Sequence, residues 1–156
     1  VIIATKTNHP ELIQIPLCED KLAVVCSTQH YLTNKQSIEP QDLEKETFLL
    51  VDSGNCLREQ VLEVYPKWSI DHHPPSMITA SSLETIKTMV AMNIGVSILP
   101  ELALQNLDPE IVVKYFTPKT PIRTISLVYR KNFTRLELIM KIKEQLNLII
   151  RPIQEE

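Results

Sequence analysis

The chain alternates short apolar runs of strand-like composition with amphipathic runs of helical spacing, and this alternation constrains its fold most strongly. Such alternation is typical of α/β units built around a largely parallel or mixed sheet. The sequence therefore predicts an α/β fold. We expect strands over residues 1–4, 11–17, 22–26, 47–51, 77–80, 96–99, 111–116 and 124–130, and helices over 56–64, 82–92, 101–105 and 135–151.

The predicted helices carry start and stop signals. Ser81 with Glu84, and Thr134 with Glu137, match the capping box, in which a serine or threonine and an acid three residues later cap the first turn. Pro152 is expected to end the last helix. We expect the apolar face of that helix, which includes Leu136, Met140 and Leu146, to be core or subunit interface.

Two corners between a predicted strand and a predicted helix are candidate sites: Gly54-Asn55-Cys56 and Ala80-Ser81-Ser82. In α/β sheets, ligands bind beyond the carboxyl ends of strands, at helix N-termini. The chain has only two glycines, Gly54 and Gly95. Each is expected where a side chain would clash or where φ is positive.

Composition excludes several classes of protein. A net charge of -3 and a pI near 5.8 argue against a nucleic-acid-binding surface on this segment. No apolar run approaches the roughly 18 residues of a membrane span, so we expect no membrane partner, and the opening residues show no signal peptide. Three cysteines without CxxC spacing do not indicate a disulfide framework or a zinc site, and a reducing cytoplasm is the expected compartment. His72-His73 also lacks metal-ligand spacing, so we expect neither a metal nor a cofactor.

Cys56 lies in the first turn of a predicted helix, which leaves two interpretations open. A helix N-terminus favours the thiolate, and the thiolate is the form that attacks peroxide. Alternatively, Cys56 is a small buried hydrophobic residue, as lone cysteines often are. Cys18 and Cys26 are expected in the core.

Three blocks of sequence resemble the regulatory domain of LysR-type transcriptional regulators. The first is a helix, glycine, strand and Leu-Pro series over residues 82–100. The second is Leu17-Cys18-Glu19-Asp20-Lys21-Leu22 with Ile38-Glu39-Pro40-Gln41-Asp42-Leu43, and the third is Arg123-Thr124-Ile125-Ser126-Leu127-Val128-Tyr129-Arg130. Within this family, the stretch from Gly54 to Gln60 resembles the OxyR branch of hydrogen peroxide sensors.

The resemblance implies roles for single residues. Cys56 would be the thiol that meets peroxide, Arg123 the cation near it, and Glu59 would stand where that branch has an aspartate. Two positions depart from the pattern. Tyr65 replaces the expected resolving cysteine, and Asn55 replaces a histidine, so the disulfide switch of that branch does not carry over intact.

The resemblance also implies a fold like that of periplasmic binding proteins, with two α/β lobes. Residues 19–123 would form the second lobe nearly whole, and residues 1–18 with 124–156 would form the remainder of the first. The N-terminal winged helix-turn-helix and the first part of lobe one have no counterpart in this sequence. A homodimer or tetramer would form through the regulatory domain, and DNA would bind through the absent domain.

Three other functions remain open. A LysR-type domain could bind a small anionic or polar effector among Ser53, Asn55, Ser81 and Arg123, with Cys56 not redox-active. A stand-alone thiol peroxidase is disfavoured by the missing resolving cysteine and the lack of a peroxidase-like Thr-x-x-Cys motif. A periplasmic substrate-binding protein is disfavoured because no signal peptide is visible. We therefore expect a non-enzymatic regulatory domain.

Overall fold

The computed structural model describes residues 1–52, 54, 56–64 and 76–154, and it divides into two compact units. The first unit joins Val1–Asp20 with Ile122–Glu156, and the second is the continuous segment Lys21–Pro121. The first unit is therefore assembled from two stretches that the whole second unit separates along the chain. Whether these units correspond to the two lobes of the family stays a prediction.

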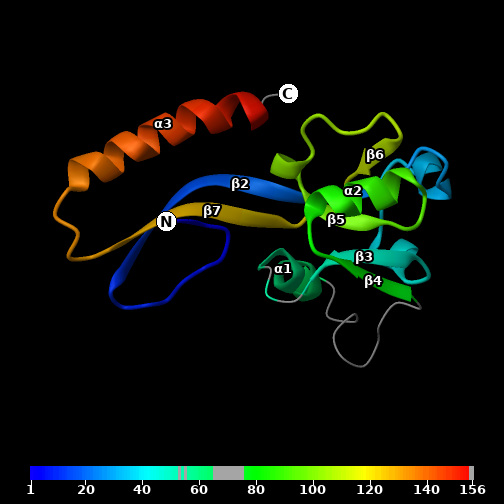
Figure 1. The fold of residues 1–156 in the computed structure, drawn as a ribbon, viewed down its shortest axis with the longest axis horizontal. Coiled ribbons are helices and arrows are strands. Elements are labelled where there is room, and N and C mark those ends of the chain that lie inside the picture. The colour runs from blue at the N-terminus through cyan, green and yellow to red at the C-terminus, as the bar shows by residue number, and fades with distance from the viewer. Residues whose placement is uncertain (53, 55, 65–75, 155–156) are drawn as a thin grey trace. The chain divides into compact units, whose positions relative to one another are not determined.

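Figure 1 shows the helices and strands with the labels used below. The strands are β1 (Ile2–Ile3), β2 (Leu12–Ser27), β3 (Thr47–Val51), β4 (Ser76–Ala80), β5 (Ser97–Pro100), β6 (Ile111–Lys114) and β7 (Ile122–Arg130). The α-helices are α1 (Cys56–Val64), α2 (Leu83–Ala91) and α3 (Leu136–Gln154), and short 3₁₀ turns cover Tyr31–Asn34, Pro40–Leu43 and Glu101–Ala103.

The second unit contains a parallel pair of strands that positions the candidate site. β3 and β4 run side by side in parallel, from Thr47 opposite Ser76 to Val51 opposite Ala80 (Figure 1). Each strand is followed by a helix, as expected for α/β units. The later half of β2 pairs antiparallel with both β5 and β6 in this unit.

One hydrophobic cluster forms the core of the second unit, and all its buried members belong to that unit. The strands contribute near-continuous apolar runs such as Phe48–Val51, which are buried on both sides. Helix α1 adds Leu57 and Val61, and α2 adds Ile86 and Val90, at the spacing that places side chains on one helical face. Burial of these faces holds both helices on the strands.

The two glycines occupy the two kinds of position that the sequence predicted. Gly54 has a φ of 93°, a conformation that residues with a Cβ rarely adopt. At Gly95, a Cβ would lie 2.4 Å from the carbonyl oxygen of Thr47, closer than such atoms can approach. That close approach allows Val96 N to donate to Thr47 O at 2.9 Å, which joins β3 to the segment that leads into β5.

The first unit consists of β1, β7, the first half of β2, and α3. β1 pairs antiparallel with β7, and β7 is the neighbour of β2 in the sheet. Among the described side chains, this unit buries few residues, namely Asp20, Ser126, Leu127, Val128 and Ile139. The sheet of this unit therefore has little apolar packing against it.

Two strand predictions need correction. The expected strands 11–17 and 22–26 form one continuous 16-residue strand, β2, which the acidic pair Glu19-Asp20 does not interrupt. Asp20 is tolerated inside the strand because Arg123 donates to its carboxylate. Of the strand predicted over residues 1–4, β1 covers only Ile2–Ile3, and Ile2 is 51% exposed.

The predicted helices 56–64, 82–92 and 135–151 correspond to α1, α2 and α3, whereas only a 3₁₀ turn over Glu101–Ala103 stands where a helix was predicted over 101–105. Two further details differ. Ser82 rather than Ser81 caps α2, and its Oγ accepts from Thr85 N at 3.1 Å. α3 continues two residues past Pro152, because a proline interrupts hydrogen bonding in its own turn without changing the φ that a helix needs. Leu136 and Met140 are exposed in this chain and so are not part of its core, and their predicted place in a subunit interface stays a prediction.

Candidate functional site

The two candidate corners meet at the same edge of the parallel pair β3 and β4. Val51 and Ala80 are opposite each other at the carboxyl ends of these strands, and Asp52 N donates to Ala80 O at 3.0 Å just beyond them. The corner that carries Gly54 and Cys56 follows β3, and the corner that carries Ser81 follows β4. Two helix N-termini, those of α1 and α2, therefore begin beyond one edge of the strands, where ligands of α/β folds bind.

Cys56 is the first residue of α1, and it is exposed. This exposure contradicts the interpretation of Cys56 as a small buried hydrophobic residue. Gly54, with its positive φ, makes the turn between β3 and α1. Asn55 and Ser53, which the sequence also placed at this corner, lie outside the described residues.

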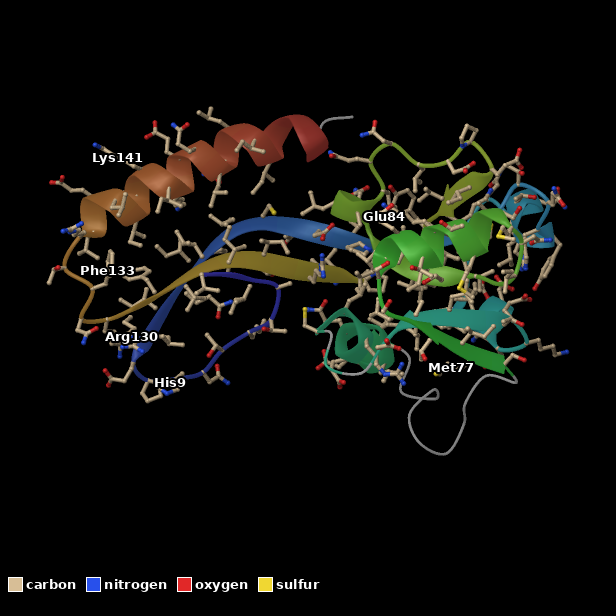
Figure 2. All side chains as sticks on the ribbon, in the orientation of Figure 1. His9, Met77, Glu84, Arg130, Phe133 and Lys141 are labelled. Carbon is tan, nitrogen blue, oxygen red and sulfur yellow. The ribbon has the colours of Figure 1, made fainter. Side chains whose placement is uncertain are left out.

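Arg58 and Glu59 follow Cys56 in the first turns of α1. The Arg58 guanidinium reaches back to the strands, where Nη1 donates to Val51 O at 3.3 Å and Nη2 lies 3.9 Å from the Sδ of Met77. Figure 2 shows Met77 on β4. Glu59 is exposed, so its carboxylate faces solvent, and among the described residues no arginine pairs with it.

Ser81 is exposed and immediately precedes the residue that caps α2. The hydroxyl of Ser82 is engaged within the helix, since it contacts Thr85 Oγ1 at 2.9 Å in addition to Thr85 N. The capping role predicted at this corner is thus confirmed for Ser82. A ligand-binding role for Ser81 stays a prediction.

Arg123 lies in the first unit, at the start of β7. Its Nε and Nη2 approach the same oxygen of Asp20, Oδ2, at 2.9 and 2.8 Å. Asp20 is 1% exposed, so its charge requires this partner. The sequence did not identify Asp20 as a partner, because the two residues are 103 positions apart. The predicted role of Arg123 beside Cys56 stays a prediction.

The other two thiols differ from Cys56. Cys26 is fully buried in β2, as expected, while Cys18 is half-buried in the first part of the same strand. Burial raises the pKa of both thiols, and the carboxylate of Asp20 raises the pKa of Cys18 further. Because the thiolate is the reactive form, neither is prepared for nucleophilic attack.

Within residues 1–52, 54, 56–64 and 76–154, no group of three or more histidine, cysteine or acidic residues is arranged to hold a metal. His72 and His73 lie outside this part of the chain. None of the helices in the part that the structure describes has the length and apolar character required to cross a bilayer.

Comparison with known proteins identifies relatives across nearly the whole chain. Residues 1–147 match the family model described as the LysR substrate binding domain. The "Hydrogen peroxide-inducible genes activator" of Haemophilus influenzae is 34% identical over 132 residues, which are 83% of this chain and 43% of that protein. The "DNA-binding transcriptional dual regulator OxyR" of Escherichia coli is 31% identical over 133 residues, again 83% of this chain and 43% of the relative. The chain thus spans less than half the length of these relatives.

A solved structure shows the same fold. The reduced form of the OxyR regulatory domain from Pseudomonas aeruginosa superposes with a TM-score of 0.82 at 33% identity, covering 94% of this chain and 71% of that one. The predicted α/β fold, of the type found in periplasmic binding proteins, is therefore confirmed.

Proposed function

Because the chain belongs to the family of LysR substrate-binding domains, we propose that it senses hydrogen peroxide through oxidation of Cys56. The observation that carries the proposal is the placement of an exposed cysteine at the first position of α1, beyond the carboxyl end of β3. Relatives with 34% and 31% identity that are named as peroxide-inducible gene activator and OxyR support it.

In the proposed reaction, the Cys56 thiolate attacks one oxygen of hydrogen peroxide. A sulfur–oxygen bond forms while the peroxide O–O bond breaks. The departing hydroxide takes up a proton to give water, so that cysteine is oxidised to sulfenic acid and peroxide is reduced. Arg123, by analogy with the family, would supply a cation to the same site.

The oxidised thiol would not be resolved by another cysteine of this chain in its folded state. Cys26 is fully buried, burial raises the pKa of Cys18, and Tyr65 occupies the position of the resolving cysteine in the resemblance. The sulfenic acid would therefore persist or react with an external thiol. This stoichiometric behaviour suits a sensor better than an enzyme that turns over.

The whole protein would be a transcriptional regulator that acts in the cytoplasm. Its regulatory domains would associate as a homodimer or tetramer, and a separate N-terminal domain would bind DNA. Oxidation at the Gly54–Cys56 corner would change the dimer interface and so the contact with DNA. These roles follow from the relatives, one of which is named as DNA-binding.

A second candidate function is the binding of a small anionic or polar effector. It is favoured by the two helix N-termini that begin beyond one edge of β3 and β4, with Ser81 exposed at one of them. In this alternative, Ser53, Asn55, Ser81 and Arg123 would contact the effector and Cys56 would be a bystander.

Peptide mass spectrometry after near-stoichiometric hydrogen peroxide, with a sulfenic-acid trap, distinguishes the two functions. We expect trapped sulfenic acid on Cys56 in the wild-type chain and none at this position in Cys56→Ser, with Cys18→Ser oxidised like wild type. An unmodified Cys56 under these conditions would overturn the peroxide proposal. A rise in melting temperature with the concentration of a small anion would then favour the effector.

A further inference from the structure

The guanidinium of Arg58 points toward the strands rather than into solvent. Nη1 donates to the carbonyl of Val51, the last residue of β3, and Nη2 contacts the thioether of Met77 on β4. One side chain from the first turns of α1 therefore touches both strands of the parallel pair. Cys56 lies only two residues earlier on the same helix.

The buried Val51 carbonyl requires a hydrogen-bond donor. Val51 is 2% exposed, and a buried carbonyl that loses its hydrogen bond pays a desolvation cost. The bond from Arg58 is charge-assisted, which makes it stronger than a bond between neutral groups. Opening of the first turn of α1 would break this bond and leave a buried acceptor without that donor.

The first turn of α1 is held to the core by one apolar side chain. Leu57, the second residue of the helix, is buried, and the next buried residue, Val61, lies one turn later. The corner before the helix turns at Gly54, which has a positive φ. The bond from Arg58 to Val51 thus ties the start of the helix to the strand end that the corner has just left.

We propose that Arg58 is a positioning residue for Cys56, because its contacts with Val51 and Met77 latch the first turn of α1 onto β3 and β4 and limit how often that turn opens. The contacts of Arg58 belong to the reduced protein and do not depend on the proposed function. Only their effect on the reaction of Cys56 with peroxide rests on that function. In that role the geometry of the guanidinium matters, and its charge alone does not suffice.

Two substitutions separate geometry from charge. Arg58→Lys keeps the positive charge but loses the planar fork that reaches two partners, and Arg58→Gln loses both. Met77→Leu keeps the volume and removes the sulfur. Arg130→Lys, on the exposed end of β7, is the matched control for an arginine-to-lysine change elsewhere.

Amide hydrogen exchange of residues 59–62 in the reduced protein is the first readout, because these are the first amides of α1 whose acceptors lie in its first turn. We expect exchange to be about tenfold faster in both Arg58→Lys and Arg58→Gln, as for the loss of one charge-assisted hydrogen bond. Met77→Leu is expected to have a smaller effect in the same direction, and Arg130→Lys none. Unchanged exchange in Arg58→Gln, or wild-type exchange in Arg58→Lys, would overturn the latch.

The rate of Cys56 alkylation at one fixed pH, relative to the rate of Cys18 in the same protein, is the second readout, and a contact that only adds global stability would change both rates alike. A turn that opens more often no longer holds the Cys56 thiol in place, so the ratio of the two rates should rise in both Arg58 variants. A rise in Arg58→Gln alone would show that charge acts without geometry, and no rise in either would also contradict the proposal. Neither readout uses peroxide, so failure of Cys56 to oxidise would refute the proposed function while leaving the latch to be decided by these data.

Discussion

The two units of the chain bury their apolar side chains to very different extents. All buried members of the hydrophobic cluster belong to Lys21–Pro121, whereas the other unit buries a handful of residues. Most of the exposed large hydrophobic side chains lie in that other unit, including several along α3, where Figure 2 labels Lys141. They are Val1, Ile2, Ile122, Phe133, Leu136, Leu138, Met140, Ile142, Leu148 and Ile149.

This difference in burial implies that different interactions stabilise each unit internally. The second unit has a dense apolar core, which is the dominant source of stability in most domains. The first depends on strand pairing and on the buried ion pair between Asp20 and Arg123. Single substitutions should therefore act differently in the two units.

The largest effect is expected from Phe48→Ala in the core of the second unit. Phe48 is fully buried, and removal of such a ring costs about 3–5 kcal/mol through lost burial and a residual cavity. Ile139→Ala is the counterpart in the first unit, where exposed neighbours leave less packing to lose, and about 2 kcal/mol or less is expected. Urea denaturation combined with segment-resolved hydrogen exchange measures the loss of stability in both variants. Equal losses would contradict the difference in packing between the two units.

An intermediate effect is expected from Asp20→Asn. The change removes the carboxylate charge that lies 2.8 Å from the Arg123 guanidinium, which is 15% exposed, at a cost of about 3 kcal/mol. Faster hydrogen exchange should be confined to β1, β7 and the first half of β2. The double variant Asp20→Leu with Arg123→Leu should recover most of the loss, because both members of the ion pair are then replaced by apolar groups. Failure to recover would show that the pair does more than neutralise itself.

The smallest effect is expected at the surface of the second unit, where Lys35 Nζ lies 2.6 Å from Asp42 Oδ1. The hydrogen bond from Lys35 lowers the pKa of Asp42. A lowered folded-state pKa adds stability above the unfolded value near 3.9, and this stability is lost as the pH falls through the folded value. Lys35 is 43% exposed, so screening keeps the contribution below about 1 kcal/mol.

Asp42→Asn tests this pair without removing the oxygen that accepts from Glu39 N. The acid-side loss of stability, followed by thermal melting between pH 5 and pH 2, should be shallower in the variant than in wild type, since about one titrating group is removed. High salt should reduce the difference. An identical slope in both proteins would show that the pair contributes nothing to stability.

The sequence predicted the second unit better than the first, for a physical reason. β3 and α1 were placed with the bounds that the structure has, because local apolar periodicity and turn chemistry determine them. Cys56 was likewise expected at the start of its helix. The continuity of β2 was missed because the partner that makes Asp20 acceptable inside a strand lies 103 residues away.

The details of the candidate site show the same limit. A serine cap could be predicted from Ser81-Ser82 and Glu84, but the choice of Ser82 depended on the backbone path. The position of Arg58 two residues after Cys56 is evident from the sequence, while its contacts with Val51 and Met77 depend on the parallel pairing of β3 and β4. Contacts between segments that are distant in sequence leave no local pattern to read.

The hydrogen bond from Leu22 N to Pro121 O, at 2.8 Å, has a consequence for the order of folding. It joins the two ends of the second unit. Once this unit has folded, the two chain segments that form the first unit therefore start close to each other. In an unfolded chain, closure of a loop of about one hundred residues would carry a large entropic cost. We therefore expect the second unit to fold first, and the two stretches of the first unit, which end at Asp20 and begin at Ile122, to pair afterwards at a low entropic cost.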